Sequence, residues 1–408
     1  MKVLHINCVY GEGSTGKLVR DIHHTILREG NNSIVVYPLK NKYVTDPNVY
    51  VCSNNFFSYA SAIYRRLSGD QFGGAYAQTN KIIHIIKKEK PDVVHLHCIN
   101  GNNINVFRLL NFLSKEEIKT VYTLHAEFPY TGGCGHAYEC EKRNSGCGNC
   151  PILKEATQSL FIDQTARTWK KLYSCYNKFK RENLYITAVS PWLENRAKTS
   201  VLLGKFSITT ILNGVDTSIF YYKSVDFPWE KFGLQKNEKF IFHATASFSP
   251  LENNLKGGKF IYELARKLEH QNIKILVAAN YIGELGNKPE NVICVGRIAD
   301  QKQLAQFYSA ATLTLITSKR ETFSMPTAES LCCGTPVVGF LAGGPESIAL
   351  KDYSDFVPYA DMNQLHDVLI NWISHPVDKQ EISRVAKDIY SKENMTNKYL
   401  QIYNVGLN

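Results

Sequence analysis

Residues 318–338 read SKRETFSMPTAESLCCGTPVV, and an apolar run, 313–316, comes directly before them. This run predicts a buried strand, and a second strand is predicted at 335–339. Between the two, Ser324 is a suitable N-cap and Pro326 suits a first helical turn, so a helix should follow the loop. Strand, loop, helix and strand in this order form the repeating unit of a parallel α/β sheet.

The same stretch carries two carboxylates. Glu321 falls on the loop at the carboxyl end of the first strand, and Glu329 lies about one turn into the helix. The backbone N–H groups around Phe323 and Ser324 are the unpaired donors of a helix start, which favours negative charge. Two hydroxyl acceptors beside an anion site suit a sugar joined to a diphosphate. Glu321 is therefore a candidate catalytic residue, and the other three are candidate donor-binding residues.

Apolar, β-branched runs recur outward from this stretch, separated by helical patterns. They lie at 3–6, 33–37, 92–97, 120–124 and 185–189 in the first half, and at 240–243, 273–278, 292–295, 313–316 and 335–339 in the second. Continuous runs of this kind are typical of strands buried on both faces of a parallel sheet. We therefore expect an α/β protein with two doubly wound, Rossmann-like domains that face each other across a cleft.

This pattern also suggests domain boundaries. We expect an N-terminal domain at 1–218, a C-terminal domain at 219–385, and a last helix at 386–408 that could pack back on the first domain. The aromatic segment 216–237 has no clean periodicity and is interpreted as the linker. A chain of 408 residues, 44% hydrophobic and 21% charged, is long enough for two ordinary globular domains.

Composition and charge restrict the cellular setting. No apolar run approaches the roughly 18–20 residues of a membrane-spanning helix, and the opening MKVLHIN is interrupted too early for a signal peptide, so we expect a cytoplasmic protein. A net charge of +10 suits either a solvated surface with a positive bias or peripheral docking to an anionic membrane, where a lipid-linked acceptor would lie. The chain has no tight Lys/Arg block, and no nucleic-acid partner is expected.

A glycine-rich loop, GEGSTG at residues 11–16, follows the first strand and opens a helix. It matches the dinucleotide pattern G-x-G-x-x-G, but the second strand ends without the carboxylate that a ribose would need. It also approaches a phosphate-binding P-loop, but Leu18 stands where a Mg²⁺-binding Ser or Thr belongs. What remains is a helix start with accessible N–H groups, so Gly13, Ser14 and Thr15 are candidate anion contacts, with a tight turn as the alternative.

Two cations and one histidine follow other predicted strands. Lys256 comes after 240–243, and Arg297 comes after 292–295. Either could balance the charge that a leaving nucleotide diphosphate gains, without Mg²⁺, although each could also be a solvated surface cation. His125 closes the strand at 120–124. It is a candidate catalytic residue that could hydrogen-bond the transferred sugar or the acceptor, and a structural histidine is the alternative.

On these motifs the chain resembles the retaining family 4 glycosyltransferases of the GT-B fold, in particular those of bacterial polysaccharide synthesis. The paired-Glu stretch 318–338 is the most specific part. Supporting segments are AVSPW at 188–192, ILNGVDTSIF at 211–220, VGR at 295–297 and GGPESI at 343–348. The resemblance implies transfer of a sugar from a nucleotide-diphosphate sugar to a saccharide or lipid-linked saccharide, with retention of configuration and without a catalytic metal or other cofactor. Surface polysaccharide, capsule or lipopolysaccharide synthesis is the implied setting.

The resemblance also implies roles for individual residues. Glu321 would hold hydroxyls of the donor sugar, Glu329 the ribose, and His125 would lie near the reacting sugar. The diphosphate would be bound by Lys256, by the amides near Phe323 and Ser324, and by the loop Gly13, Ser14 and Thr15. Family members often carry an arginine several residues before the lysine, but 245–255 contains none, so binding would depend on Lys256 or Arg297.

Four cysteines cluster shortly after His125. Cys134, Cys140, Cys147 and Cys150 include one Cys-x2-Cys pair and could hold a structural zinc ion. Reduced thiols or a local disulfide are the alternatives, since only one half of the cluster has strong spacing. The segment resembles an insertion found in some polysaccharide-synthesis members of the family and is expected to shape the acceptor side.

Two other functions use similar features. A sugar-nucleotide epimerase or hydrolase could use the same two-domain cleft, but it would need a group to remove a carbon-bound proton or to activate water. Only Glu127 and His125 are available for that task. A sugar- or nucleotide-binding module without catalysis is the second alternative.

Overall fold

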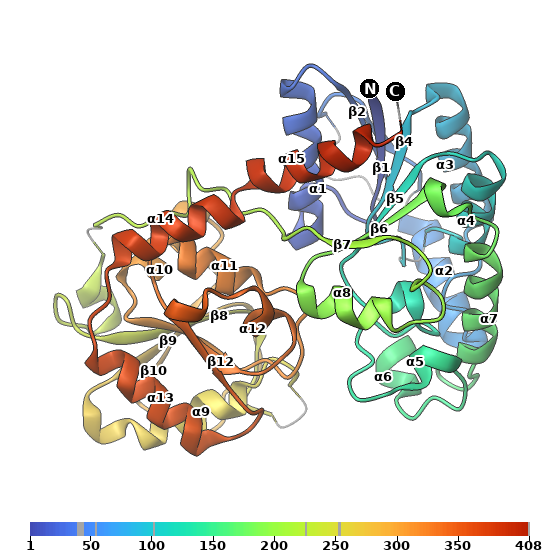
Figure 1. The fold of residues 1–408 in the computed structure, drawn as a ribbon. Helices are drawn as coiled ribbons and strands as arrows, with labels where there is room; N and C mark the ends of the chain where they lie inside the picture. The colour runs from blue at the N-terminus through green and yellow to red at the C-terminus, as the bar shows by residue number, and fades with distance from the viewer. Residues whose placement is uncertain (39–44, 54, 101–102, 225–226, 252–253, 407–408) are drawn as a thin grey trace. The chain divides into compact units, whose positions relative to one another are not determined.

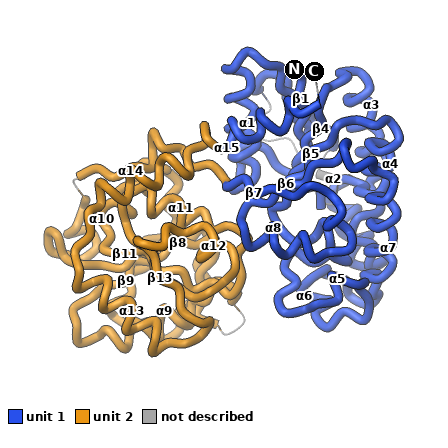
Figure 2. Tube along the Cα trace, viewed as in Figure 1, with its two compact units in different colours: residues 1–212, 395–408 blue, residues 213–394 orange. Residues whose placement is uncertain are grey.

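The computed structural model describes residues 1–38, 45–53, 55–100, 103–224, 227–251 and 254–406. The chain divides into two compact units (Figures 1 and 2). Unit 1 comprises Met1–Leu212 and Met395–Asn408, and unit 2 comprises Asn213–Asn394.

Unit 1 is built on a parallel sheet of seven strands in the order β3-β2-β1-β4-β5-β6-β7. The strands are β1 Lys2–Ile6, β2 Asn32–Tyr37, β3 Val49–Val51, β4 Val93–Leu96, β5 Thr120–Leu124, β6 Leu184–Ala188 and β7 Ile208–Thr210. The helices are α1 Gly13–Arg28, α2 Asn55–Ser68, α3 Tyr76–Glu89, α4 Val106–Lys115, α5 Lys142–Ser145, α6 Leu153–Thr157, α7 Thr165–Tyr176 and α8 Pro191–Lys198, with short 3₁₀ turns at Phe128–Tyr130 and Arg181–Asn183.

Unit 2 repeats this architecture with six parallel strands in the order β10-β9-β8-β11-β12-β13. They are β8 Phe240–Phe248, β9 Lys274–Ile282, β10 Val292–Gly296, β11 Leu313–Ile316, β12 Val337–Phe340 and β13 Ser354–Val357. The helices are α9 Gly258–Lys267, α10 Gln301–Ala310, α11 Met325–Cys332, α12 Gly344–Ile348, α13 Met362–Ser374 and α14 Lys379–Tyr390, with 3₁₀ turns at Trp229–Phe232, Glu269–Gln271 and Lys351–Tyr353. The last helix, α15 Lys392–Asn404, begins at the end of unit 2 and belongs to unit 1 from Met395 onward. The prediction of two doubly wound α/β sheets is confirmed.

Each sheet has one point where the strand order reverses. In unit 1 it lies between β1 and β4, which are paired from Val3 with Val93 to Ile6 with Leu96. In unit 2 it lies between β8 and β11, which are paired at Ile241 with Leu313. Ligands of open α/β sheets bind outside the carboxyl ends of the strands at such a point, so these two strand pairs define where a site should be sought.

The last helix, α15, packs on unit 1 (Figure 1). Met395, Tyr399 and Tyr403 join a buried cluster with residues of α1, β1, β4 and β5. The preceding α14 instead packs on α11, and Lys392 pairs with Asp216 at 2.6 Å. The contacts therefore divide the chain after 212 and after 394, where the hydrophobic pattern had suggested 218 and 385.

The interpretation of 216–237 as a linker is wrong. Phe220, Phe227 and Leu234 are each buried. Phe227 stacks on Phe240 of β8, with ring centroids 5.4 Å apart, so the segment belongs to the core of unit 2. Its aromatic residues pack on the sheet without helical or strand periodicity, which is why the pattern suggested a linker.

Candidate functional site

The clearest site lies at the reversal point of unit 2. Lys256 follows β8, Glu321 follows β11, and these strands are neighbours in the sheet. The Lys256 Nζ atom lies 2.5 Å from Glu321 Oε1, and the two side chains are 30% and 22% exposed. An ion pair that remains this accessible contributes about 1 kcal/mol or less to stability. The pair thus offers a cation and a carboxylate to a ligand at little cost to the fold.

The backbone fixes Lys256 against the end of β11. Gly257 has a φ of 71°, and a Cβ added there would lie 2.1 Å from the carbonyl oxygen of Thr317. Thr317 Oγ1 donates to the carbonyl of Lys256 at 2.8 Å, and the amide of Lys319 donates to Leu255 at 2.9 Å. Only a glycine allows this close approach, and the approach places the lysine beside Glu321.

Glu321 is held from its other side by the turn before α12. Its amide donates to the carbonyl of Ala342 at 3.0 Å, and its own carbonyl accepts from the amide of Gly344 at 2.9 Å. Glu346 in turn accepts from the amides of Ala342 and Gly343. The backbone N–H and C=O of Glu321 are therefore both hydrogen-bonded, which fixes the position of the backbone from which its carboxylate extends.

Helix α11 begins beside Glu321. Ser324 is its N-cap with a φ of 86°, a conformation that a non-glycine residue adopts at a cost, and its Oγ accepts from Thr327. Phe323 is buried. One turn later, Glu329 Oε2 accepts from the hydroxyl of buried Tyr308 at 3.2 Å. Burial, and then the nearby Glu329, raise the pKa of Tyr308 well above its ordinary value, so its hydroxyl remains a donor that orients this carboxylate.

Arg297 is not brought to this group by its strand. It is exposed and follows β10, an edge strand that β9 and β8 separate from β11. The structure thus brings Lys256 and Glu321 into contact at the ends of β8 and β11, and it places Ser324 and Glu329 on the helix that follows Glu321. Arg297 follows a strand at the edge of the sheet, away from β11.

In unit 1 the glycine-rich loop joins the carboxyl ends of β1 and β4. The amide of Cys8 donates to Cys98 at 2.9 Å, which ties the loops after these two strands together. Gly13 and Ser14 are exposed and Thr15 is half-buried at the start of α1. Glu12, the N-cap, is exposed and its side chain does not cap the helix. The first turn of α1 is therefore accessible from solvent, and the anion contact stays a prediction.

His125 ends a row of histidines beneath this edge of the sheet. Its Nε2 lies 3.3 Å from Nδ1 of His97, whose Nε2 lies 3.3 Å from Nδ1 of His5. The ring of His95 is tilted against that of His97, with centroids 3.9 Å apart, and its two nitrogens contact Tyr403 Oη at 2.6 Å and Thr123 Oγ1 at 2.7 Å. Because His95 already uses both nitrogens, the group His5, His95 and His97 is a hydrogen-bonded network and not an open metal site.

Burial keeps these imidazoles neutral. It lowers the pKa of His5 to about 3 and that of His125 to about 4, and it lowers those of His95 and His97 well below the ordinary value. At neutral pH the ring of His125 is thus uncharged, and it is a weak base.

Glu127, the other residue considered for proton abstraction, is used by the fold. It is fully buried, and its carboxylate accepts from Arg196 at 2.7 Å, Tyr130 at 3.1 Å and the amide of Ala137 at 2.7 Å. A carboxylate paired in this way is a structural group, because losing one partner of a buried pair destabilises strongly. The epimerase or hydrolase alternative is not favoured.

The four clustered cysteines line one small cavity near α5 and α6. This segment is attached to the loop after His125, since the amide of Glu127 donates to the carbonyl of Gly135 at 2.9 Å.

Comparison with known proteins places this geometry in a family. The family Glycosyltransferase Family 4 matches residues 19–219, and Glycosyl transferases group 1 matches residues 236–388. WcaC of Escherichia coli (strain K12), which is named as a colanic acid biosynthesis glycosyl transferase, is 21% identical to this chain over 99% of each chain. A glycosyltransferase from Rickettsia africae ESF-5 has a TM-score of 0.68 at 15% identity, covering 99% of this chain and 98% of that one. HepE of Anabaena, solved with UDP and glucose, has a TM-score of 0.62 at 15% identity over 98% of each chain.

The two family matches follow one another along nearly the whole chain. The protein is a glycosyltransferase with the GT-B fold and belongs to the family 4 and group 1 glycosyltransferases. Within the described part of the chain, no helix is both long and apolar enough to span a membrane.

Sequence reasoning missed the groups that position the site. Tyr308, Thr317 and His97 contact the candidate residues from buried positions on other elements. Each lies inside an apolar run or helix where a polar residue carries no distinctive spacing. Only the strand order shows that they meet the site.

The approach of Gly257 to Thr317 generates a test. We expect Gly257→Ala to lower the free energy of unfolding by about 2–4 kcal/mol, because left-handed strain adds to a clash. Gly233→Ala is the matched control, since Gly233 has a φ of 63° but open space around it, and should cost only about 1–2 kcal/mol. Equal losses in denaturant titrations of the two variants would contradict the role of Gly257.

The neutral histidines generate a pH dependence. In the unfolded chain histidine titrates near pH 6.5, so between about pH 6.5 and 4 the unfolded state binds more protons and stability falls as the pH falls. Each of these histidines should lower the free energy of unfolding by up to about 1.4 kcal/mol for each pH unit of acidification in this range. We expect unfolding titrations at pH 7 and pH 5.5 to show this loss, His5→Gln to reduce it, and exposed His270→Gln to leave it unchanged. A pH-independent midpoint in the unmodified protein would show that the histidines are not buried neutral.

Proposed function

We propose that this glycosyltransferase binds a nucleotide-diphosphate sugar on unit 2 and transfers the sugar, with retention of configuration, to a saccharide acceptor in surface polysaccharide synthesis. The observation that carries the proposal is the Lys256–Glu321 pair at the reversal point, beside the start of α11. The name of WcaC supports the polysaccharide setting, and the UDP and glucose complex of HepE supports the donor class.

In this proposal each group has one task. The ammonium of Lys256 and the amides at the start of α11 take up the charge of the diphosphate, as preorganised donors do in a site that needs no metal. Glu321 accepts from hydroxyls of the donor sugar, and Glu329, oriented by Tyr308, accepts from the ribose. His125 contributes a neutral hydrogen-bonding ring from unit 1.

The chemical step needs no protein nucleophile. An acceptor hydroxyl attacks the anomeric carbon from the face that the diphosphate leaves, the bond between that carbon and the phosphate oxygen breaks, and the hydroxyl proton passes to the departing oxygen. The low pKa of His125 and the paired state of Glu127 agree with this route, since neither is a competent base at neutral pH.

The donor site is tested by product formation from a panel of UDP-, GDP-, dTDP- and ADP-sugars with and without Mg²⁺. We expect Lys256→Ala and Glu321→Ala each to lower turnover about 10²–10³-fold, the usual cost of removing one charge-stabilising group. Exposed Lys302→Ala and Glu263→Ala are matched controls and should retain activity. Full activity in either site variant would refute the assignment.

We further propose that unit 1 docks on an anionic membrane that carries a lipid-linked acceptor. Helix α2 exposes a row of large apolar side chains, among them Phe56 and Tyr59, which are 75% and 73% exposed. Tyr76, at the start of α3, continues this surface. Exposed apolar side chains in such a group are typical of membrane or partner contacts.

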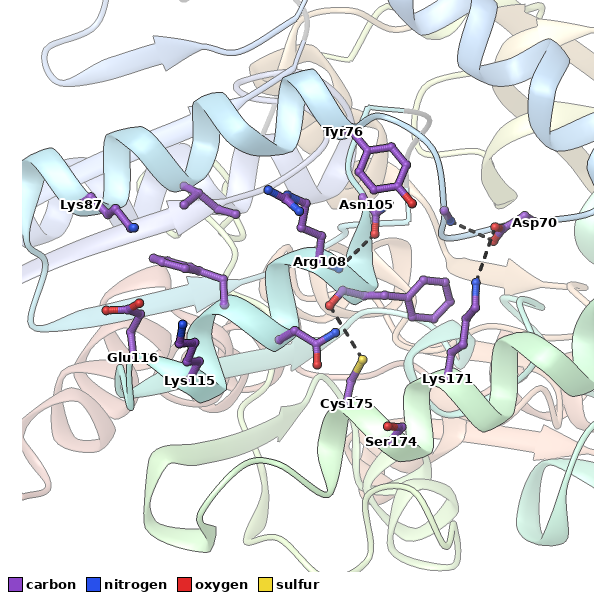
Figure 3. A pocket seen from close by; sticks show the side chains of 15 residues that line it. Asp70, Tyr76, Lys87, Asn105, Arg108, Lys115, Glu116, Lys171, Ser174 and Cys175 are labelled. Carbon is purple, nitrogen blue, oxygen red and sulfur yellow. Dashed lines mark hydrogen bonds and ion pairs between the residues drawn. The ribbon is translucent and has the colours of Figure 1, made fainter.

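A basic cavity of about 660 Å³ adjoins Tyr76 between α3, α4 and α7 (Figure 3). Its charged lining residues are Lys87, Arg108, Lys115, Lys171, Asp70 and Glu116. Cations outnumber acids, and the cavity lies beside the apolar surface. This combination suits an anionic headgroup next to acyl chains.

Flotation with vesicles tests the membrane proposal. We expect the protein to bind phosphatidylglycerol vesicles at low salt and not phosphatidylcholine vesicles, and the double variant Phe56→Ser, Tyr59→Ser to bind several-fold less. Tyr281→Ser, which replaces an equally exposed tyrosine of unit 2, should bind as the unmodified protein does. If the protein does not bind anionic vesicles, the membrane proposal is wrong. If the double variant binds as well as the unmodified protein, the exposed apolar surface of α2 is not the membrane contact.

A further inference from the structure

We propose that Cys134, Cys140, Cys147 and Cys150 form a tetrahedral zinc site that orders the segment after His125. The four thiols come from separate turns of the chain and line one cavity of about 20 Å³. A cavity needs roughly 10–15 Å³ to hold one water-sized occupant, so this volume suits a single ion and excludes a sugar or nucleotide. The inference is independent of the proposed donor site.

The chain is shaped to bring these thiols together. Gly132 lies so close to Cys147 that a Cβ added to the glycine would stand 2.9 Å from the Cβ of the cysteine. The Cys-x2-Cys turn contains Asn149 in the left-handed region, with a φ of 46°. Lys142 Nζ donates to the carbonyls of Gly148 and Asn149 at 2.9 and 2.7 Å, which closes this turn.

Backbone amides donate to two of the four sulfur atoms. The amide of Gly132 donates to Cys147 Sγ over 3.1 Å, and the amide of Ile152 donates to the sulfur of Cys150. Such bonds stabilise thiolates and orient them toward a metal, and they are the outer contacts that a zinc ligand requires. Cysteines that served only as apolar packing groups would not need these N–H···S hydrogen bonds.

The ligand chemistry favours zinc. Four thiolates form a closed structural site for this ion, with Zn–S bonds of about 2.3 Å. In the described part of the chain only His5, His95 and His97 already place three ligand atoms within 4.8 Å of one another. Binding of zinc would therefore draw the four sulfurs inward from the cavity wall.

The position of the site gives it a consequence. The cysteine segment contacts the His125 loop through Glu127, whose carboxylate accepts from Ala137 and whose amide donates to Gly135. Thr131 Oγ1 also donates to the carbonyl of Cys134 at 2.9 Å. Closing this segment with an ion would restrict the loop that carries His125.

Elemental analysis of the purified full-length protein tests the site. We expect about one zinc per chain, with the four thiols protected from alkylation until a chelator removes the ion. Cys147→Ser should lose the zinc, while Cys294→Ser, which replaces a half-buried cysteine of unit 2, should retain it. Cobalt substitution should give thiolate-to-metal charge-transfer absorption that Cys147→Ser lacks.

Two results would overturn the proposal. One is unmodified protein that contains no zinc, takes up no cobalt and alkylates at all four thiols in its native state. The other is protein in which these thiols are paired as disulfides. Because the readout is metal content and not turnover, an inactive donor site would leave this test intact.

Discussion

The site depends on the adjacency of β8 and β11 at the point where the strand order of unit 2 reverses. Parallel strands end at one edge of the sheet, so the two residues that follow these strands meet although 65 positions separate Lys256 from Glu321 in the chain. Gly257 makes the approach possible, and Thr317 locks it with a hydrogen bond. The partly exposed ion pair contributes little to stability, so its value lies in the charges that it offers a ligand.

Unit 1 follows the same rule with different chemistry. The carboxyl ends of β1 and β4 meet at the glycine-rich loop, and β5 places His125 next to them. Two tyrosines of α15 support this edge: the hydroxyl of Tyr403 contacts buried His95, and the hydroxyl of Tyr399 contacts Thr123. The C-terminal helix is therefore part of the framework under His125. A ring kept neutral by burial suits hydrogen bonding to sugar hydroxyls better than proton abstraction.

Much of this could be predicted from the sequence. The continuous apolar runs predicted all the central strands. The paired-Glu stretch predicted that Glu321 lies on the loop after β11 and that Ser324 is the N-cap of α11. The short edge strands β3, β7 and β13 were missed because, unlike the short central strands β4, β11 and β12, they are not buried along their whole length, which weakens the continuous apolar pattern. Tyr308 and Thr317 were missed because their contacts come from the packing of separate helices and strands, which local pattern does not encode. The segment 216–237 was misread because its aromatics pack irregularly on β8.

The central claim is that Glu321 recognises the donor sugar and Lys256 the diphosphate. Calorimetric titration of each variant with a sugar nucleotide and with its free nucleotide diphosphate, without metal, separates the two roles. We predict that Glu321→Ala binds both ligands with similar affinity, because it has lost the preference for the sugar, whereas Lys256→Ala loses affinity for both. Unchanged preference for the sugar nucleotide in Glu321→Ala, with unchanged diphosphate affinity in Lys256→Ala, would contradict this claim.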